Sequence, residues 1–196
     1  SAPTTSSPAP AWALPSTEAM LADRVLGKAD APVTMIEYSS FTCPHCAQFT
    51  AETFPKIKSE YIDTGKLKFV FRDYPLNNPS LAAAVVARCL PLERYFGFAE
   101  MLFRDQKEWT QHPDMKGVLD DLKVRAQLAG LSDADFDACL KNADLIKGIQ
   151  TRAAEAEKQY KIDSTPTFIV NGKSVPGALP FADFKTAIDA ALAQAK

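Results

Sequence analysis

The stretch that decides the fold runs Val33-Thr34-Met35-Ile36-Glu37-Tyr38-Ser39 and continues, through Ser40-Phe41-Thr42, into Cys43-Pro44-His45-Cys46. Its first part is a short, mostly apolar run, which predicts a buried strand over residues 33–39. The residues after the cysteines have helical periodicity, so a helix is expected to begin at the pair. Two thiols three positions apart at the start of a helix make redox chemistry the leading hypothesis.

The end of a helix explains why this position suits a reactive thiol. With Cys43 near the N-cap, Pro44 at the first helical position loses only an N–H group that would have been unpaired. The N–H groups of His45 and Cys46 then point toward the Cys43 sulfur and, with the helix dipole, favour a thiolate there. We expect Cys43 to be the exposed, attacking sulfur and Cys46 the buried, resolving one, close enough to form a disulfide.

His45 predicts the direction of the chemistry. A partly protonated imidazole in the first turn adds a second positive influence on the Cys43 thiolate. Each pKa unit below the ambient pH stabilises the reduced form by about 1.4 kcal/mol, which is about 30 mV for a two-electron couple. The pair is therefore predicted to be oxidising.

Other readings of a C-x-x-C motif have less support. A structural zinc site needs a second Cys or His pair at short spacing, whereas Cys89 and Cys139 stand alone. His112 lies in a Gln-His-Pro-Asp loop and is typical of a solvated turn residue. Two inert buried cysteines fit poorly with a Pro-His insert at a strand-to-helix junction. We therefore predict no metal site and no cofactor.

Composition bounds the function classes. The chain has 196 residues, 46% of them hydrophobic, and a net charge of −2, which allows a sizeable core and argues against nucleic-acid binding through bulk positive charge. No run approaches the roughly 20 apolar residues that span a bilayer. The sequence begins at Ser1 without an export signal, so any such signal is expected to have been removed or left out. Four cysteines are compatible with an oxidising compartment.

Further elements follow along the chain. The first helix is expected to be kinked at Pro55 and to stop at Gly65. Strands are predicted over residues 67–73, 167–170 and 173–175, the last two joined by an Asn171-Gly172 turn. The region from residue 78 to 160 has a helical pattern broken at Pro91, residues 111–113 and Gly130, and a last helix is expected from Pro180 through Ala193.

This order predicts an α/β protein with a thioredoxin fold, a mixed central sheet and an inserted helical domain. Residues 1–23 are expected to form a flexible leader rich in Pro, Ser and Ala. Residues 24–77 and 161–196 are predicted to form the thioredoxin-like domain, and residues 78–160 the insertion.

The chain resembles the DsbA family of bacterial periplasmic thiol-disulfide oxidoreductases. Residues 37–46, with their acidic strand and Cys-Pro-His-Cys motif, and Ser164-Thr165-Pro166-Thr167 carry the resemblance, which extends from about residue 24 to the C-terminus. It implies a cis bond before Pro166, although only about 5 to 6% of X-Pro bonds are cis. Thr165 would then offer its backbone to an extended substrate segment.

The resemblance also assigns the remaining acidic and sulfur side chains. Glu37 matches a buried acid that could accept the proton of Cys46, the alternative being a glutamate at a sheet edge that faces solvent. Spacing alone leaves Cys89 and Cys139 as two buried thiols or as one disulfide, and the resemblance to a branch with a second disulfide implies the bond. Thr165 departs from the valine of the best-known oxidases and is common among related isomerases.

These observations predict a periplasmic thiol-disulfide oxidase that passes the Cys43–Cys46 disulfide to reduced, unfolded exported proteins through a mixed disulfide at Cys43. A DsbB-like membrane oxidase is expected to reoxidise it, and a monomer is expected. The alternatives are an isomerase or reductase, whose dimerisation domain would find no room in a short leader, and a protein that holds Cu(I) at the C-x-x-C motif.

Overall fold

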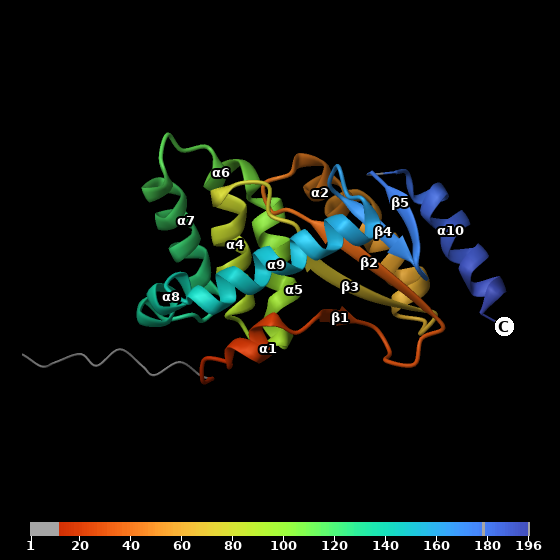
Figure 1. The fold of residues 1–196 in the computed structure, drawn as a ribbon, viewed down its shortest axis with the longest axis horizontal. Coiled ribbons are helices and arrows are strands. Elements are labelled where there is room, and N and C mark those ends of the chain that lie inside the picture. The colour runs from red at the N-terminus through yellow and green to blue at the C-terminus, as the bar shows by residue number, and fades with distance from the viewer. Residues whose placement is uncertain (1–11, 178, 196) are drawn as a thin grey trace, which may run out of the picture.

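The computed structural model describes residues 12–177 and 179–195, and Figure 1 gives their arrangement. Five strands form one sheet in the order β1-β3-β2-β4-β5. Only β2 and β3 run parallel, and the other neighbouring pairs are antiparallel. The predicted thioredoxin fold with a mixed sheet is confirmed. The strands are β1 (Arg24–Leu26), β2 (Val33–Ser39), β3 (Leu67–Asp73), β4 (Thr167–Val170) and β5 (Lys173–Pro176).

The helix that begins at the cysteine pair is a chain of short segments. These are α2 (Pro44–Gln48), the π-helical η1 (Phe49–Thr53), α3 (Phe54–Ile57) and the π-helical η2 (Lys58–Ile62). Phe54 donates its N–H to the Phe49 carbonyl five residues back, immediately before Pro55, which has no N–H to donate. The expected kink at Pro55 is thus a wider turn ahead of the proline, and Gly65 follows the helix at a φ of +77°.

The helical insertion has more breaks than the sequence predicts. The breaks near Pro91, residues 111–113 and Gly130 are present, and the structure adds others at Asp105 and at residues 141–142. Its helices are α4 (Asn78–Arg88), α5 (Leu92–Arg104), α6 (Gln106–Thr110), α7 (Met115–Leu128), α8 (Asp133–Leu140) and α9 (Ala143–Tyr160), and α10 (Phe181–Gln194) closes the chain. Figure 1 shows α4, α7 and α8 at one end, with α9 running back across to β4.

The segment before β1 packs on the fold. Ser16 caps a short helix, α1 (Thr17–Leu21), by accepting the Ala19 N–H, and Met20 in that helix is 2% exposed. Helix α1 contacts α9, where Gly148 leaves room for Leu21: a Cβ at position 148 would lie 2.6 Å from a Leu21 methyl carbon. The leader expected over residues 1–23 therefore differs from the structure over residues 12–23, while residues 1–11 lie outside the described residues.

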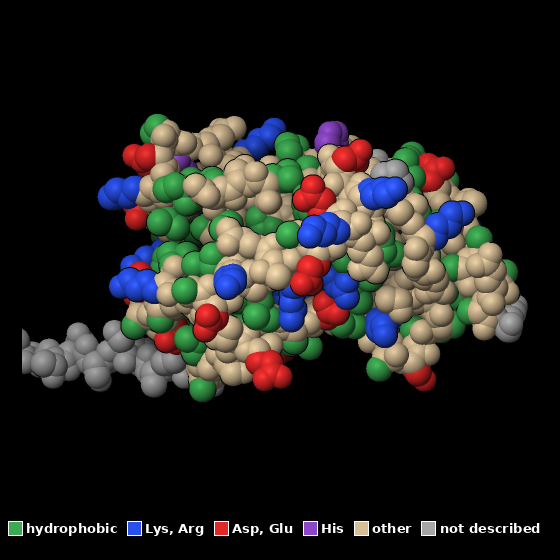
Figure 2. All heavy atoms as spheres, viewed as in Figure 1, with side chains coloured by type: hydrophobic (Ala, Val, Ile, Leu, Met, Phe, Trp, Pro, Cys, Tyr) green, Lys and Arg blue, Asp and Glu red, His purple; other side chains and the backbone are tan. Residues whose placement is uncertain are grey.

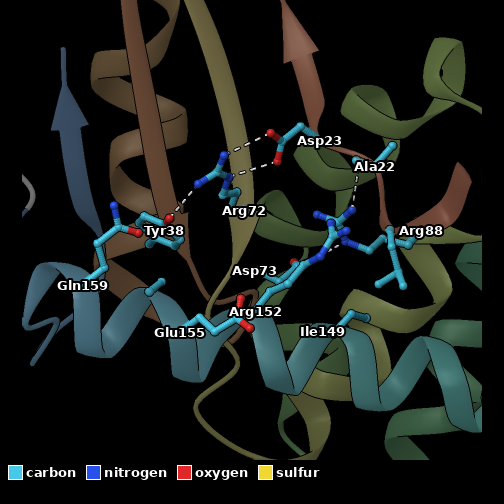
Figure 3. Close-up of a pocket in the computed structure, with 12 residues that line it drawn as sticks. Ala22, Asp23, Tyr38, Arg72, Asp73, Arg88, Ile149, Arg152, Glu155 and Gln159 are labelled. Carbon is cyan, nitrogen blue, oxygen red and sulfur yellow. Dashed lines mark hydrogen bonds and ion pairs between the residues drawn. The ribbon is translucent and has the colours of Figure 1, made fainter. Parts of the chain in front are cut away.

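Buried charges tie this N-terminal segment to the sheet (Figure 3). The Arg88 guanidinium pairs with Asp73 at 2.6 Å and donates to the carbonyl oxygens of Met20 and Ala22 at 3.0 and 2.9 Å. Nearby, Arg72 binds both oxygens of Asp23 and the Tyr38 hydroxyl. These side chains line a pocket of about 330 Å³ against α9.

A disulfide joins Cys89, at the end of α4, to Cys139 in α8, with Cα atoms 6.4 Å apart. It links two parts of the insertion that are 50 positions apart in sequence. Figure 2 shows basic and acidic side chains interspersed over the face that α9 covers, without a broad area of one sign in this view. None of the described helices combines the length and apolar character that a membrane span requires.

Candidate active site

The cysteine pair lies where the end of β2 meets the start of α2. Cys43 is the N-cap residue in an extended conformation, and Pro44 occupies the first turn of the helix. Cys46 is fully buried, and Cys43, expected to be exposed, keeps only 7% of its surface. Both are free thiols here, so the structure represents the reduced form of the pair. Pro44 and His45 are exposed and border the sulfur from the helix side.

The surroundings of Cys43 favour its thiolate. A hydrogen bond from the Cys46 thiol, with smaller contributions from Thr165 and the backbone N–H groups of Cys46 and His45, outweighs burial and lowers the pKa of Cys43 to about 5. The helix N-terminus thus acts through the predicted N–H groups. His45 contributes its backbone, and the influence of its exposed imidazole stays a prediction.

Cys46 has the opposite tendency. Burial, its hydrogen bond to Cys43 and the charge of Glu37 all raise the pKa of the Cys46 thiol. The reduced pair therefore carries one negative charge near neutral pH, located on Cys43, while Cys46 keeps its proton. This separates an attacking or leaving sulfur from a resolving sulfur.

Glu37 lies behind the pair on the central strand. Strand β2 runs between β3 and β4, with Glu37 opposite Phe71 on one side and Phe168 on the other. Its side chain is 2% exposed, so the alternative of a solvent-facing edge glutamate is wrong. Burial raises the pKa of Glu37 to about 8, with Ser39 partly opposing and the Cys43 charge adding to the rise. A carboxyl group that titrates near neutral pH can both give and take a proton.

The loop before β4 completes the site. The Thr165–Pro166 bond is cis, and the Cys43 thiol donates to the Thr165 carbonyl oxygen at 3.5 Å. The Pro166 carbonyl accepts the Gly177 N–H at 2.9 Å, and the Thr167 hydroxyl donates to the Ser164 carbonyl. The loop and the cysteine helix, distant in sequence, therefore face each other across one sulfur atom.

Comparisons with known proteins agree with this geometry. A protein-family model described as Thioredoxin matches residues 20–190. Disulfide bond formation protein D of Bacillus subtilis is 30% identical over 176 residues, which are 84% of this chain and 75% of that protein. The crystal structure of Wolbachia pipientis alpha-DsbA1 is 32% identical, has a TM-score of 0.82, and the match covers 88% of this chain and 92% of that one. The chain belongs to the DsbA family.

Relatives of this DsbA-family chain also occur in Rickettsia. A Rickettsia bellii protein named "Putative protein-disulfide oxidoreductase" is 30% identical over 175 residues, or 89% of this chain. The chain spans 55–66% of the length of three Rickettsia relatives that it matches.

Sequence reasoning missed one residue that the DsbA-family fold brings to the pair. Gln106 on α6 is 7% exposed, and its side-chain Nε2 donates to the carbonyl oxygens of Phe41 and Cys43 at 2.8 and 3.0 Å. The loop before the pair also receives a contact from α4, whose N-cap Asn77 accepts the Thr42 hydroxyl. No local sequence signal marks Gln106, because its partners lie more than 60 positions away.

Two further predictions concern residues that lie away from the site. His112 is half-buried and bonded to Asp121 of α7, so it is more ordered than the solvated turn residue that the sequence suggests. The Cys89–Cys139 disulfide lies within the insertion. Within the part of the chain that the structure describes, no three His, Cys, Asp or Glu side chains are grouped as metal ligands.

Proposed function

We propose that this DsbA-family protein is a periplasmic thiol-disulfide oxidase that donates its Cys43–Cys46 disulfide to exported proteins. The observation that carries the proposal is the lowered pKa of Cys43. A stabilised thiolate favours the reduced enzyme, and therefore the transfer of the disulfide to a substrate, by about 30 mV for each pKa unit below the ambient pH.

The reaction takes two exchange steps. A substrate thiolate attacks the Cys43 sulfur of the oxidised enzyme, the bond to Cys46 breaks, and Cys46 leaves with the electron pair. A second substrate thiolate then attacks the substrate sulfur of this mixed disulfide, and Cys43 leaves as a thiolate. The substrate gains a disulfide, the enzyme pair gains two electrons, and the low pKa of Cys43 makes it the better leaving group.

Glu37 supplies the proton that the first step needs. Cys46 leaves as a thiolate in a buried position where its raised pKa calls for a proton. Because the pKa of Glu37 is about 8, its carboxyl group holds a proton near neutral pH and can give it to Cys46. In the reverse direction the Glu37 carboxylate takes that proton back from Cys46, which is the role that the family resemblance implies.

The loop at Thr165 and Pro166 is the proposed docking surface for substrate. An extended segment beside the cis-proline would pair with backbone groups, which recognises main chain and permits many protein substrates. Reoxidation is proposed to come from a DsbB-like membrane oxidase, and the working form to be a monomer. Neither nucleic acid nor a cofactor enters the proposal.

An isomerase or reductase is the second candidate, and Thr165 is the observation that favours it. One experiment separates the two: equilibration of the protein with glutathione buffers gives its reduction potential, while thiolate absorbance against pH gives the pKa of Cys43. An oxidase has a potential well above that of cytosolic reductants and a Cys43 pKa near 5. A reduction potential near that of cytosolic reductants would contradict the oxidase. So would a protein that refolds substrates with scrambled disulfides and whose sedimentation mass is that of a multimer.

The catalytic assignment has its own control. Cys43→Ala should abolish the oxidation of a reduced model protein. In Cys46→Ala the remaining Cys43 thiolate should attack a model protein that contains a disulfide and stay trapped in a mixed disulfide, which reducing agents release. Cys89→Ala with Cys139→Ala removes the other two cysteines, which form a disulfide, and should leave the exchange in place. Normal rates in Cys43→Ala would refute the assignment.

A further inference from the structure

A second cavity lies beside Glu37. It has a volume of about 290 Å³ and is bounded by β1, β2 and β3, by the segments from η1 to η2, and by α5 of the insertion. Five phenylalanines line it: Phe54, Phe69, Phe71, Phe96 and Phe103. The size is at the lower end of small-molecule sites, which are typically apolar with a few polar groups.

A buried carboxyl group with one unpaired oxygen lines this cavity. Glu37 lines it, and the Glu37 atom Oε2 has no hydrogen-bond partner within the described residues. Lys58 and Glu100, which also line the cavity, are exposed and therefore mark its mouth. A buried polar atom without a partner costs free energy, so a ligand that donates to it gains that free energy on binding.

The charges around the cavity select the sign of the ligand. Lys58 places its ammonium 3.0 Å from Asp63, which compensates its charge. Glu100 forms no ion pair with the residues described. The faces of phenylalanine rings attract cations as well. The walls and the mouth therefore favour a positively charged guest over an anion. Such a guest also favours release of the Glu37 proton, which leaves a carboxylate at the buried end to pair with it.

We propose that this cavity binds a small organic ammonium ion with an apolar body, whose ammonium group donates to Glu37 while the phenylalanines enclose the rest. Because the apolar body replaces water along aromatic walls, it contributes affinity that a metal cation or free ammonium would lack. The site is separate from the substrate-docking loop at Thr165 and Pro166.

Occupancy should be linked to the redox state, a part of the proposal that rests on the proposed function. Reduction places a negative charge on Cys43, which interacts with Glu37 through the protein interior. A cation beside Glu37 gains from that charge, because opposite charges in a protein, where the effective dielectric constant is about 20, attract each other more strongly than in water. The ammonium ion should bind the reduced form about tenfold more tightly, and saturation with it should favour the reduced form by the same factor.

The test uses benzylamine as the probe and benzyl alcohol as its uncharged counterpart. Calorimetric titration of the full chain should show benzylamine binding at least tenfold more tightly than benzyl alcohol. Glu37→Gln should remove that preference, since an amide cannot lose a proton and pair with the ammonium ion as a carboxyl group can. Equal affinities for benzylamine and benzyl alcohol would overturn the proposal. So would a preference for benzylamine that survives in Glu37→Gln.

Gly97 allows the cavity to be filled without touching the cysteines. It lies on α5 at the cavity wall, and an added Cβ there would meet nothing within 4 Å. Gly97→Leu should weaken benzylamine at least tenfold, while Gly97→Ala, a matched control with a single methyl group, should change it less than threefold. Benzylamine affinity unchanged in Gly97→Leu, with circular dichroism confirming the fold, would place the probe elsewhere and overturn the site.

Titration of both redox forms separates this proposal from the proposed function. Equal affinity for the two forms, in a protein that still oxidises a reduced substrate, would refute the redox link alone. Tenfold tighter binding to the reduced form supports it. A chain that binds benzylamine as expected but fails to exchange disulfides would refute the oxidase and leave the cation site standing.

Discussion

The Cys43 sulfur and the Thr165 carbonyl oxygen lie 3.5 Å apart, although 122 positions separate the two residues. One belongs to the helix that begins after β2 and the other to the loop that precedes β4. The antiparallel pairing of β2 with β4 brings these two chain segments to the same edge of the sheet. The reactivity of Cys43 is therefore set by a helix end and by a loop that the rest of the fold must deliver.

Thr165→Val tests the contribution of this loop to the thiolate. The Thr165 side chain helps to lower the pKa of Cys43, so its loss should raise that pKa and make the protein a weaker oxidant, by about 30 mV per pKa unit. Thr165→Ser keeps a hydroxyl group and should stay close to wild type. Thiolate absorbance against pH measures the change, and a lower pKa in Thr165→Val would refute this role of the hydroxyl.

Glu37→Gln should stabilise the reduced protein in a pH-dependent way. The pKa of Glu37 rises from 4.5 to about 8 on folding, so its stabilising contribution is complete below pH 4.5 and is lost progressively as the pH rises from 4.5 to 8. An amide does not titrate and escapes this loss. At pH 7 the variant should gain on the order of 3 kcal/mol relative to its difference at pH 4.

Urea unfolding of the reduced proteins at pH 4 and pH 7 measures this change. Glu100→Gln, an exposed carboxyl group on α5, is the matched control and should show little pH-dependent gain. A Glu37→Gln variant whose stability difference from wild type is the same at both pH values would mean that Glu37 titrates normally in the folded protein.

Local sequence signals predicted most of the site. The strand at 33–39, the start of the helix at Cys43 and the Asn171-Gly172 turn each depend on neighbours within a few residues, and the structure contains all of them. The position of Glu37 on a central strand was left open because it depends on which strands pair with β2. The cis bond before Pro166 came from the family resemblance, since the residues themselves favour trans.

Long-range contacts could not be predicted from the sequence, because they too depend on how distant segments of the chain pack together. Gln106 meets the carbonyl oxygen of Cys43 only because the insertion folds back on the cysteine loop. Helix α1 has only five residues and depends on packing against α9. The Pro-rich segment before it therefore suggested a flexible leader through residue 23. Such elements have no periodic pattern long enough to indicate them.

Gln106→Ala should destabilise the protein and loosen the cysteine loop. The change leaves the buried Phe41 and Cys43 carbonyl oxygens without their donor from α6, which typically costs about 1–3 kcal/mol. Because one of those oxygens belongs to Cys43, the pKa of Cys43 should also shift. Gln111→Ala, which alters an exposed glutamine at the end of the same helix, is the control. Equal stability and equal thiolate titration in both variants would deny Gln106 a positioning role.

Removal of the second disulfide should act on stability and spare the exchange reaction. The Cys89–Cys139 bond closes a loop of 50 positions, and the chain-entropy relation gives a stabilisation of about 4 kcal/mol for such a loop. Replacing both cysteines by alanine should lower the urea midpoint of unfolding accordingly. The dependence of the unfolding free energy on urea concentration should change little. The rate at which the variant oxidises a reduced model protein should remain that of wild type, and loss of exchange in a folded variant would assign this bond a catalytic role.

Arg88→Met tests the buried ion pair that anchors the N-terminal segment. The variant leaves the Asp73 carboxylate buried without its partner at 2.6 Å and removes the donor to the Ala22 carbonyl oxygen (Figure 3). It also removes the donor to the Met20 carbonyl oxygen. Breaking one side of such a pair costs about 3–5 kcal/mol. Thermal unfolding should report this loss, and proteolysis should cut the α1 segment faster than in wild type.

Two controls distinguish the loss of the pair from a general loss of packing. Asp73→Leu combined with Arg88→Met replaces both charges by apolar groups and should recover much of the stability, because no unpaired charge is left. Lys116→Ala removes an exposed pair with Asp120 and should leave the midpoint unchanged within error. A double variant that is less stable than Arg88→Met by the full cost of a second mutation would show that the Arg88 side chain, and not its charge pairing, holds the segment in place.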